Sequence, residues 1–313
     1  MEDILDEGAK DRREAAVPPE AAGWRLDRAT ELLWPETGLR GRRRLIAAGA
    51  VLVDGQLRGP AYRVRTGEIL AGQIPARPEG AFTAADVPVL VQTGDFAAVS
   101  KPAGLHSAAI AHGGGQSLDD LLPALFPDRA AILLSRLDRL TSGIVAVALT
   151  PGAGTRYRDL EDAGQVAKDY LAVVHGVIAD PFVVDFRLDT ADRAKTRVRF
   201  KSEPDPLRHT QVEPLDRLDG LTLVRCRIAK GARHQIRAHL AGAGHPLVGD
   251  PVYGRGEGER LHLHCAALAC PVLDASDPPA WTLAEAAATA RGAARKKGAA
   301  EEGAATDGPE GVP

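Results

Sequence analysis

The sequence predicts an α+β protein in which a small α+β domain precedes a larger domain built on a mixed, mainly antiparallel β-sheet flanked by helices and loops. Three observations support this prediction. Two short patterns of helical periodicity lie ahead of a few short strand patterns near the start of the chain. Further along, strand-like apolar runs alternate with helices irregularly, without the even rhythm of a parallel sheet. The 313 residues suffice for about two domains.

The small domain is expected at residues 23–74. Apolar side chains recur at helical spacing over 25–33 and again over 40–49, which predicts two helices. The dipeptide Asp54-Gly55, which is typical of β-hairpins, follows the second pattern. The expected strands are 51–53, 62–64 and 68–70.

The larger domain is expected at residues 89–284. Its strands are predicted from short apolar runs at 96–100, 144–149, 170–175 and 221–228. In the last of these, Cys226 and its alternate neighbours form one apolar face, while Arg225 and Arg227 point to the other.

Three segments outside the domains have compositions that disfavour a packed core. Residues 1–22 are acidic and contain a Pro-Pro pair, so we expect them to be disordered. Residues 75–88 resemble a linker. Residues 285–313 form a low-complexity tail whose first part is compatible with a helix.

Composition argues against several classes of protein. Apolar residues make up 44% of the chain, and no apolar run reaches the roughly 18 residues that a membrane span requires. The acidic start lacks the layout of a secretory signal. Three cysteines without a CxxC pair are typical of a reducing compartment. We therefore expect a cytoplasmic protein that does not associate with membranes. We also expect it to be a monomer.

Charge is unevenly distributed along the chain. The net charge is −3, yet residues 21–74 carry nine arginines against five acids, a balance of +4. Four arginines crowd the second predicted helix with Glu36 as the nearby acid: Arg40, Arg42, Arg43 and Arg44. Because like charges at this spacing repel, the cluster favours a polyanionic partner over a merely solvated helix.

The segment SRLDRLTSGIVAVAL, residues 135–149, is the first candidate for chemistry. Asp138 lies between two leucines just before a predicted buried strand, where an ionised side chain is costly unless it is paired. A structural alternative is an Asp that caps the turn through Thr141 or Ser142. The tripeptide RLD also occurs at 25–27 and 217–219, so it carries little information by itself.

The second candidate is AKGARHQIRAHLAGAGHPLVGDPVYG, residues 229–254. A helix is expected over 233–241, which would place Arg233 and Arg237 on one face. Two like charges four residues apart favour an anion between them, either a protein carboxylate or an RNA phosphate. A solvated basic helix is the structural alternative.

These two segments, together with VSKPAGLHS (99–107) and VAKDYLAVVHG (166–176), resemble the RluA-type pseudouridine synthases. That family carries four corresponding motifs in the same order. The segment LHLHCAALAC resembles the family's closing strand, and residues 23–74 resemble an S-four-type RNA-binding domain. The chain departs from the usual pattern at Ser135, where a His is common, and at Ala232, where an Arg is common.

The resemblance implies isomerisation of uridine in structured RNA, a reaction that requires no cofactor. It assigns the essential carboxylate to Asp138, either as a nucleophile or as a base towards the sugar. Arg237 would pair with this carboxylate, and Tyr170 would line the uracil pocket and relay a proton. Residues expected to contact the RNA are Lys101, Arg136, Arg139, Lys168, Arg233, His234 and Gln235, together with the four arginines of the small domain.

Large-subunit ribosomal RNA is the expected target, with transfer RNA as the alternative. A competing interpretation is a catalytically inactive, ribosome-associated RNA-binding protein of the same fold. A hydrolase is disfavoured because no GxSxG motif is present. A metal site is not expected, since the neighbouring residues His262, His264, Cys265 and Cys270 lack finger spacing.

Overall fold

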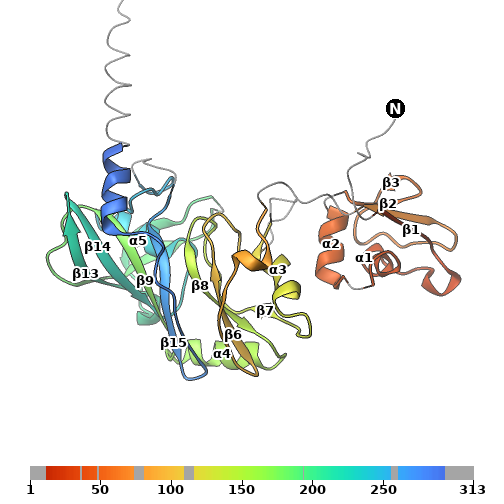
Figure 1. Cartoon of the computed structure of the whole chain (residues 1–313), viewed down its shortest axis with the longest axis horizontal. Helices are drawn as coiled ribbons and strands as arrows, with labels where there is room; N and C mark the ends of the chain where they lie inside the picture. Colours follow the sequence, from red (N-terminus) through yellow and green to blue (C-terminus); the bar gives the residue numbers. More distant parts are fainter. Residues whose placement is uncertain are drawn as a thin grey trace, which may run out of the picture. The chain divides into compact units, whose positions relative to one another are not determined.

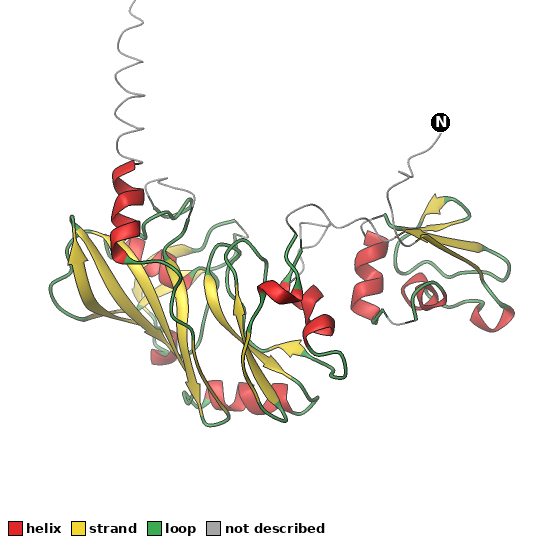
Figure 2. Cartoon of the chain, in the orientation of Figure 1, coloured by secondary structure: helices red, strands yellow, loops and turns green. Residues whose placement is uncertain are grey.

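The computed structural model describes residues 12–35, 37–47, 49–73, 81–108, 116–192, 194–254 and 260–292. The chain divides into two compact units (Figure 1). The first comprises residues 1–82 and 108–120, and the second comprises residues 83–107 and 121–313. Both combine helices with strands, as Figure 2 shows, and the predicted α+β class is confirmed.

The smaller unit places two helices against an antiparallel sheet. The helices are α1 (Leu26–Ala29), which continues as the 3-10 turn η2 (Thr30–Leu32), and α2 (Leu39–Ala47). The strands, in their order across the sheet, are β1 (Arg12–Ala16), β4 (Ile69–Gln73), β2 (Val51–Val53) and β3 (Gln56–Leu57). Val53 and Gln56 flank the Asp54-Gly55 turn and pair across it, so the predicted hairpin is confirmed.

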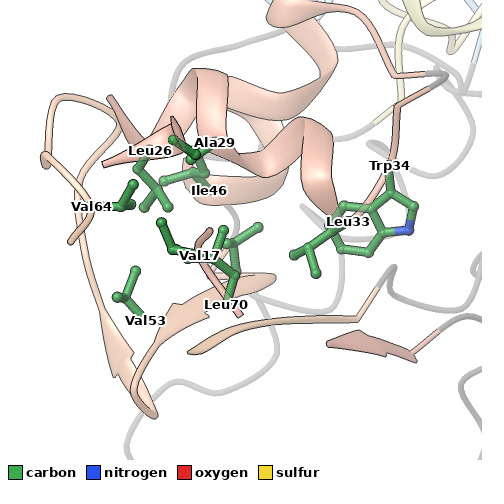
Figure 3. Close-up of a cluster of buried hydrophobic side chains, with 11 residues drawn as sticks. Val17, Leu26, Ala29, Leu33, Trp34, Ile46, Val53, Val64 and Leu70 are labelled. Carbon is green, nitrogen blue, oxygen red and sulfur yellow. The ribbon is translucent and has the colours of Figure 1, made fainter. Parts of the chain in front are cut away.

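An aliphatic core with one tryptophan holds this unit together. Leu26, Ile46 and Leu70 are almost fully buried in it (Figure 3). Trp34 packs so closely on Gly72 that any Cβ at position 72 would overlap the indole ring. Burial of large apolar side chains contributes about 1.5–3 kcal/mol each, which makes this cluster the main stabilising element of the unit.

The N-terminal segment differs from its sequence prediction. The expectation that residues 1–22 are disordered is wrong for residues 12–22, while residues 1–11 lie outside the described residues. Strand β1 pairs with β4 along its whole length, and Val17 and Ala21 are buried. The predicted strand at 62–64 is also wrong, because residue 63 makes only an isolated bridge with Arg25.

The larger unit is built on one long mixed sheet. Its strands are β5 (Val89–Gln92), β6 (Phe96–Lys101), β7 (Ile132–Leu133), β8 (Ser142–Ala148), β9 (Ala167–His175), β10 (Phe182–Val184), β13 (Thr210–Leu218), β14 (Leu221–Ile228), β15 (Leu263–Cys270) and β16 (Leu273–Ser276). They run across the sheet in the order β10-β13-β14-β9-β15-β8-β6-β5, with β16 beside β15 and β7 beside β8. Within the described residues only β8 and β15 pair in parallel, so the predicted mixed, mainly antiparallel sheet is confirmed.

Helices and a separate hairpin accompany this sheet (Figure 2). The helices are α3 (Leu118–Leu125), α4 (Ala153–Asp162) and α5 (Gln235–Gly242). The hairpin consists of β11 (Phe186–Asp189) and β12 (Arg197–Ser202). A further helix spans 283–292, across the predicted domain boundary at 284. Its Ala286 and Ala287 are buried in one apolar cluster with Trp281, so the start of the predicted tail belongs to this unit.

Two other expectations can be compared with the described residues. The predicted linker, 75–88, lies partly outside them, and a 3-10 turn, η3 (Ala84–Asp86), forms in its later part. No helix in the described part of the chain is both long and apolar enough to cross a membrane.

Candidate active site

Asp138 lies in the loop between β7 and β8, and this loop is fixed by the segment after β6. Ser107 Oγ donates to Leu137 O at 2.8 Å and accepts from Leu137 N at 2.9 Å. Gly104 N donates to Arg139 O at 2.7 Å. The KPAGLHS and RLD motifs are therefore joined directly, and the backbone on both sides of Asp138 is held in place.

The turn after Asp138 lets two strands approach closely. Thr141 N donates to the backbone oxygen of Asp138 at 3.1 Å, so the carboxylate is not the cap of this turn. Gly143 has φ +109°, and any Cβ there would overlap the backbone of Cys265 in the neighbouring strand β15. Glycine is thus required by both backbone conformation and space.

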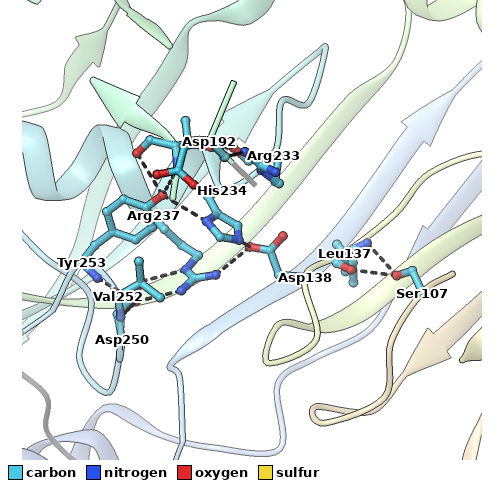
Figure 4. A network of polar contacts seen from close by, with 11 residues as sticks. Ser107, Leu137, Asp138, Asp192, Arg233, His234, Arg237, Asp250, Val252 and Tyr253 are labelled. Atoms are coloured by element: carbon cyan, nitrogen blue, oxygen red, sulfur yellow. Dashed lines mark hydrogen bonds and ion pairs between the residues drawn. The ribbon is translucent and has the colours of Figure 1, made fainter. Parts of the chain in front are cut away.

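The carboxylate of Asp138 instead binds Arg237 of helix α5 (Figure 4). Arg237 Nη1 donates to Asp138 Oδ2 at 2.9 Å. The same guanidinium makes a bidentate pair with Asp250, at 2.8 Å from Nε and 2.9 Å from Nη2. Arg237 and Asp250 are buried, whereas the Asp138 side chain is 22% exposed. One arginine therefore links a buried carboxylate to one that is open to solvent.

The sequence prediction missed Asp250 as the second partner of Arg237. It lies in the GDPVYG segment, and its Oδ1 also accepts from the backbone N–H groups of Val252 and Tyr253. Burial opposes charge on Asp250, but the hydrogen bonds from Arg237 and from these two N–H groups lower its pKa. Burial likewise opposes charge on Arg237, while Asp250 and then Asp138 raise its pKa. The predicted pairing of Arg237 with Asp138 is present in the structure.

His234 forms a second contact with the Asp138 carboxylate. Its backbone is left-handed, with φ 55°, immediately before helix α5. Nε2 lies 3.7 Å from Asp138 Oδ2, and Nδ1 lies 3.0 Å from the hydroxyl of Tyr253. Burial lowers the pKa of His234; Asp138 opposes this shift, and Arg237 and Arg233 add to it.

The Tyr253 hydroxyl lies within hydrogen-bonding distance of three groups but has a single proton to donate. It accepts from Thr196 N at 2.7 Å and lies 3.0 Å from Thr196 O. Its single proton can go to that carbonyl or to His234 Nδ1. The choice decides whether Nε2 presents an N–H or a lone pair to Asp138, so Tyr253 sets the tautomer of His234.

Tyr170 lies in β9, opposite Cys226 of β14 and Cys265 of β15. The side chain is buried, and burial raises its pKa well above the usual value. Contact with Cys265 and the negative charge of Asp138 act in the same direction. Tyr170 is therefore a neutral phenol within electrostatic range of Asp138.

Lys101 does not lie where an RNA contact would require it. It is fully buried, and Nζ is 2.8 Å from both Pro102 O and Leu105 O and 3.4 Å from Arg139 O. Burial lowers the pKa of Lys101 to about 7; Asp138 opposes this shift, and Arg139 adds to it. The amine cross-links the loop around Asp138 from within, so the expectation of an RNA-contacting rim lysine is wrong.

Two further residues of the expected RNA-binding set have structural partners. Lys168 is buried and pairs with Glu161 at 2.5 Å, which ties β9 to helix α4. Gln235 is buried; its Oε1 accepts from Ala232 N at 3.0 Å and its Nε2 donates to Arg208 O at 2.9 Å. In both cases the contacts observed hold the protein scaffold together.

Arg233 and Arg237 do not share a helical face as predicted, because the left-handed residue His234 separates Arg233 from helix α5. The Arg233 guanidinium donates to the carbonyl oxygens of Thr190 and Asp192. An anionic partner, as predicted, is present for Arg237, which binds the carboxylates of Asp138 and Asp250. Arg233 anchors the loop that joins β11 to β12.

The remaining expected arginines fall into two groups. Arg136 and Arg139 flank Asp138, are exposed, and have no polar side-chain partner within the described residues. In α2, Arg42 donates to Glu31 at 2.9 Å, and Arg43 donates to Asp27 at 2.7 Å. The argument that these arginines lack acids is therefore wrong for this pair. The side chains of Arg40 and Arg44 lie outside the described residues.

In this fold the partly exposed Asp138 carboxylate lies within electrostatic range of the buried Tyr170. Sequence comparison assigns the family of the chain: residues 95–242 match the RNA pseudouridylate synthase description. The chain is 34% identical over 253 residues to the ribosomal large subunit pseudouridine synthase D of Xanthomonas campestris, covering 77% of this chain and 75% of that protein. It is also 34% identical to the Pseudomonas aeruginosa protein of the same name, with 78% of each chain covered. The chain belongs to the RNA pseudouridylate synthase family and is an RNA pseudouridine synthase.

Solved structures agree with this assignment at the level of fold. The human RNA pseudouridylate synthase domain containing 1 superposes with a TM-score of 0.55 at 22% identity, covering 65% of this chain and 87% of that chain. The human RNA pseudouridylate synthase domain containing 4 gives 0.53 at the same identity, covering 65% and 92%. The larger unit thus has the pseudouridine synthase fold, and the predicted enzyme class is confirmed.

Proposed function

We propose that this enzyme converts specific uridines of large-subunit ribosomal RNA to pseudouridine, with Asp138 as its essential carboxylate. The observation that carries the catalytic assignment is the Asp138–Arg237–Asp250 network, which holds one solvent-accessible carboxylate beside buried Tyr170. The ribosomal target is supported by relatives that bear the name of large-subunit enzymes. Transfer RNA is the alternative target.

The geometry suits an isomerisation. The bond from the sugar to the uracil nitrogen breaks, the base turns, and a new bond forms from the same sugar carbon to carbon five, which then loses its proton. Asp138 would act on the sugar, either by attack on the anomeric carbon or by removing a sugar proton. Arg237 would orient the carboxylate, and Tyr170 would line the uracil pocket and relay the proton. The target nucleotide must leave its stack, at a cost of a few kcal/mol.

The smaller unit would serve as an S-four-type RNA-binding domain. Residues 21–74 carry a balance of +4, and Arg25 and Arg43 are about half exposed. This surface would bind RNA phosphates and help to select the target, while the larger unit supplies the chemistry. We further propose that the enzyme acts as a cytoplasmic monomer without membrane association.

The test is to map pseudouridines in total RNA from cells without this protein and from cells complemented with wild type, Asp138→Asn or Asp128→Asn. Asp128 is exposed in the same unit and serves as the control. We expect discrete sites in large-subunit ribosomal RNA that wild type and Asp128→Asn restore and Asp138→Asn does not. Sites confined to transfer RNA would overturn the target assignment. Asp138→Asn activity within tenfold of wild type would overturn the catalytic one.

A further inference from the structure

The β11–β12 hairpin stands apart from the main sheet, and its second strand, β12, is exposed along most of its length. Its two strands pair with each other and, within the described residues, with no other strand. In β12 every residue except Val198 is exposed. Val198 lies against Gly242 at the end of helix α5, which anchors the strand at that point. The rest of the strand is therefore held out towards solvent.

The hairpin segment carries more basic than acidic residues, and two of its arginines lie opposite each other. Residues 186–202 contain six basic residues and two acids, a balance of +4 in a chain whose net charge is −3. Arg187 lies directly opposite Arg199 in the ladder, so their side chains share a face. Like charges in this position destabilise a hairpin. Arg199 pairs with Asp189 at 2.7 Å, and Arg187 and Arg197 lie within 4 Å of Glu203 and Asp192, at 3.8 and 3.7 Å. All three arginine side chains nevertheless stay more than half exposed, at 54%, 66% and 59%, so each can also reach a phosphate.

A bulge adds an aromatic side chain to this basic surface. The register shifts between Phe186 and Arg187, which leaves Phe200 and Lys201 of β12 without direct partners. The side chain of Phe200 is 74% exposed and makes an edge contact with Phe186 at 5.2 Å between ring centroids. Bulges often redirect side chains near active sites. Exposed aromatic rings beside basic residues are the combination that binds single-stranded nucleic acid.

The hairpin is connected directly to the catalytic residues. At its loop, Arg233 binds the carbonyls of Thr190 and Asp192, and Thr196 binds Tyr253. Lys195 Nζ lies 5.2 Å from the centre of the Tyr253 ring, and the Arg237 guanidinium lies 5.3 Å from the same centre. An RNA strand along the hairpin would thus run towards the nucleotide at Asp138.

We propose that the β11–β12 hairpin binds the RNA strand that flanks the target uridine. Arg187, Arg197 and Arg199 contact its phosphates, and Phe200 stacks on one of its bases. This inference rests on the proposed function for the identity of the substrate. The competing explanation is that the charges merely protect an exposed strand edge from aggregation. That explanation predicts no effect of these residues on RNA binding.

The test compares two triple variants that remove the same charge. One is Arg187→Gln with Arg197→Gln and Arg199→Gln. The matched control is Arg208→Gln with Arg225→Gln and Arg227→Gln, three arginines of the same unit whose side chains are 41–53% exposed and also stand in ion pairs. Binding of unmodified large-subunit ribosomal RNA, transcribed in vitro, is titrated at several salt concentrations. The kinetics of pseudouridine formation are measured on the same RNA.

For the hairpin variant we expect the salt slope of binding to fall by about two relative to the control, since three phosphate contacts at about 0.7 each are lost. The KM should rise about tenfold or more, with kcat unchanged. Phe200→Ala should weaken binding about tenfold without changing the slope. A salt slope equal to that of the control would overturn the proposal. Because binding is read without catalysis, a wild type that binds but forms no pseudouridine would refute the proposed function and leave this inference testable.

Discussion

Helix α2 of the smaller unit and the loop around Asp138 are both rich in arginine, yet they use the charge differently. In α2, Arg42 and Arg43 bind Glu31 and Asp27, carboxylates that folding brings to them. Around Asp138, Arg136 and Arg139 extend into solvent without a partner in the described part of the chain. A run of arginines in a sequence therefore does not reveal how much charge remains for RNA. What matters is how many carboxylates the fold supplies nearby.

The largest effect should come from Arg237, the arginine with the most carboxylate contacts in this site. Arg237→Ala leaves Asp250 buried without its cation, and breaking such a buried pair costs about 3–5 kcal/mol. Urea unfolding should show this loss, and pseudouridine formation should be abolished. Arg227→Ala, which breaks the exposed pair with Asp169, should cost under about 1 kcal/mol. Equal stability of the two variants would show that burial does not decide how strongly an arginine stabilises this protein.

Lys101 extends the comparison to a buried amine whose hydrogen bonds go to backbone carbonyl groups. Its pKa is about 7 in the folded protein and 10.5 as the ordinary value. Between these pH values the unfolded chain binds a proton that the folded chain has released. The free energy of unfolding should therefore rise with pH across this window, by at most about 1.4 kcal/mol per pH unit.

Lys101→Met removes this titration. The stability of wild type minus that of the variant should grow from pH 7 to pH 10, as measured by urea unfolding at each pH. A difference that stays constant over this range would mean that the buried amine keeps its ordinary pKa. Lys230→Met is a suitable control because its pKa is raised, chiefly by the hydrogen bond to Asp162.

The smallest effects on stability are expected from variants that compare helix α2 with the loop around Asp138. Arg42→Gln loses contacts with Glu31 and two carbonyls, and should cost about 1 kcal/mol of stability with little change in RNA affinity. The double variant Arg136→Gln, Arg139→Gln should leave stability within about 0.5 kcal/mol and weaken RNA binding. Thermal unfolding and RNA titration of both variants test the contrast. The reverse pattern would mean that the helix, not the loop, supplies the free charge.

Features that depend on local sequence could be predicted. The predicted bounds of the strand at 221–228 agree with the structure at both ends, because side chains of the two faces alternate along its whole length. The pairing of Asp138 with Arg237 was also predicted, since four motifs in order implied it. Asp250 was not predicted because its pairing with Arg237 depends on how the loop after helix α5 packs against that helix, which the local sequence does not show. Lys101 was misplaced because no local pattern distinguishes a lysine that points inward from one that points outward.

Two further predictions failed because they depend on contacts that the local sequence does not show. Residues 12–16 look disordered by composition, but strand β4, more than fifty residues away in sequence, provides their hydrogen-bond partners. The predicted start of the helix at Arg233 failed because His234 adopts a left-handed conformation that the contacts of Tyr253 and Asp138 stabilise. Both errors involve interactions between residues that are distant in the chain.

The position of β15 has a consequence for how the enzyme is made. This strand is inserted between β8 and β9, so it joins the strand that follows the Asp138 loop to the strand that carries Tyr170 (Figure 1). Because β15 ends at Cys270, these two strands can be joined through it only after the chain has been synthesised through that residue. A nascent chain that ends before Leu263 already contains Asp138, Tyr170 and Arg237 but lacks the strand that joins β8 to β9.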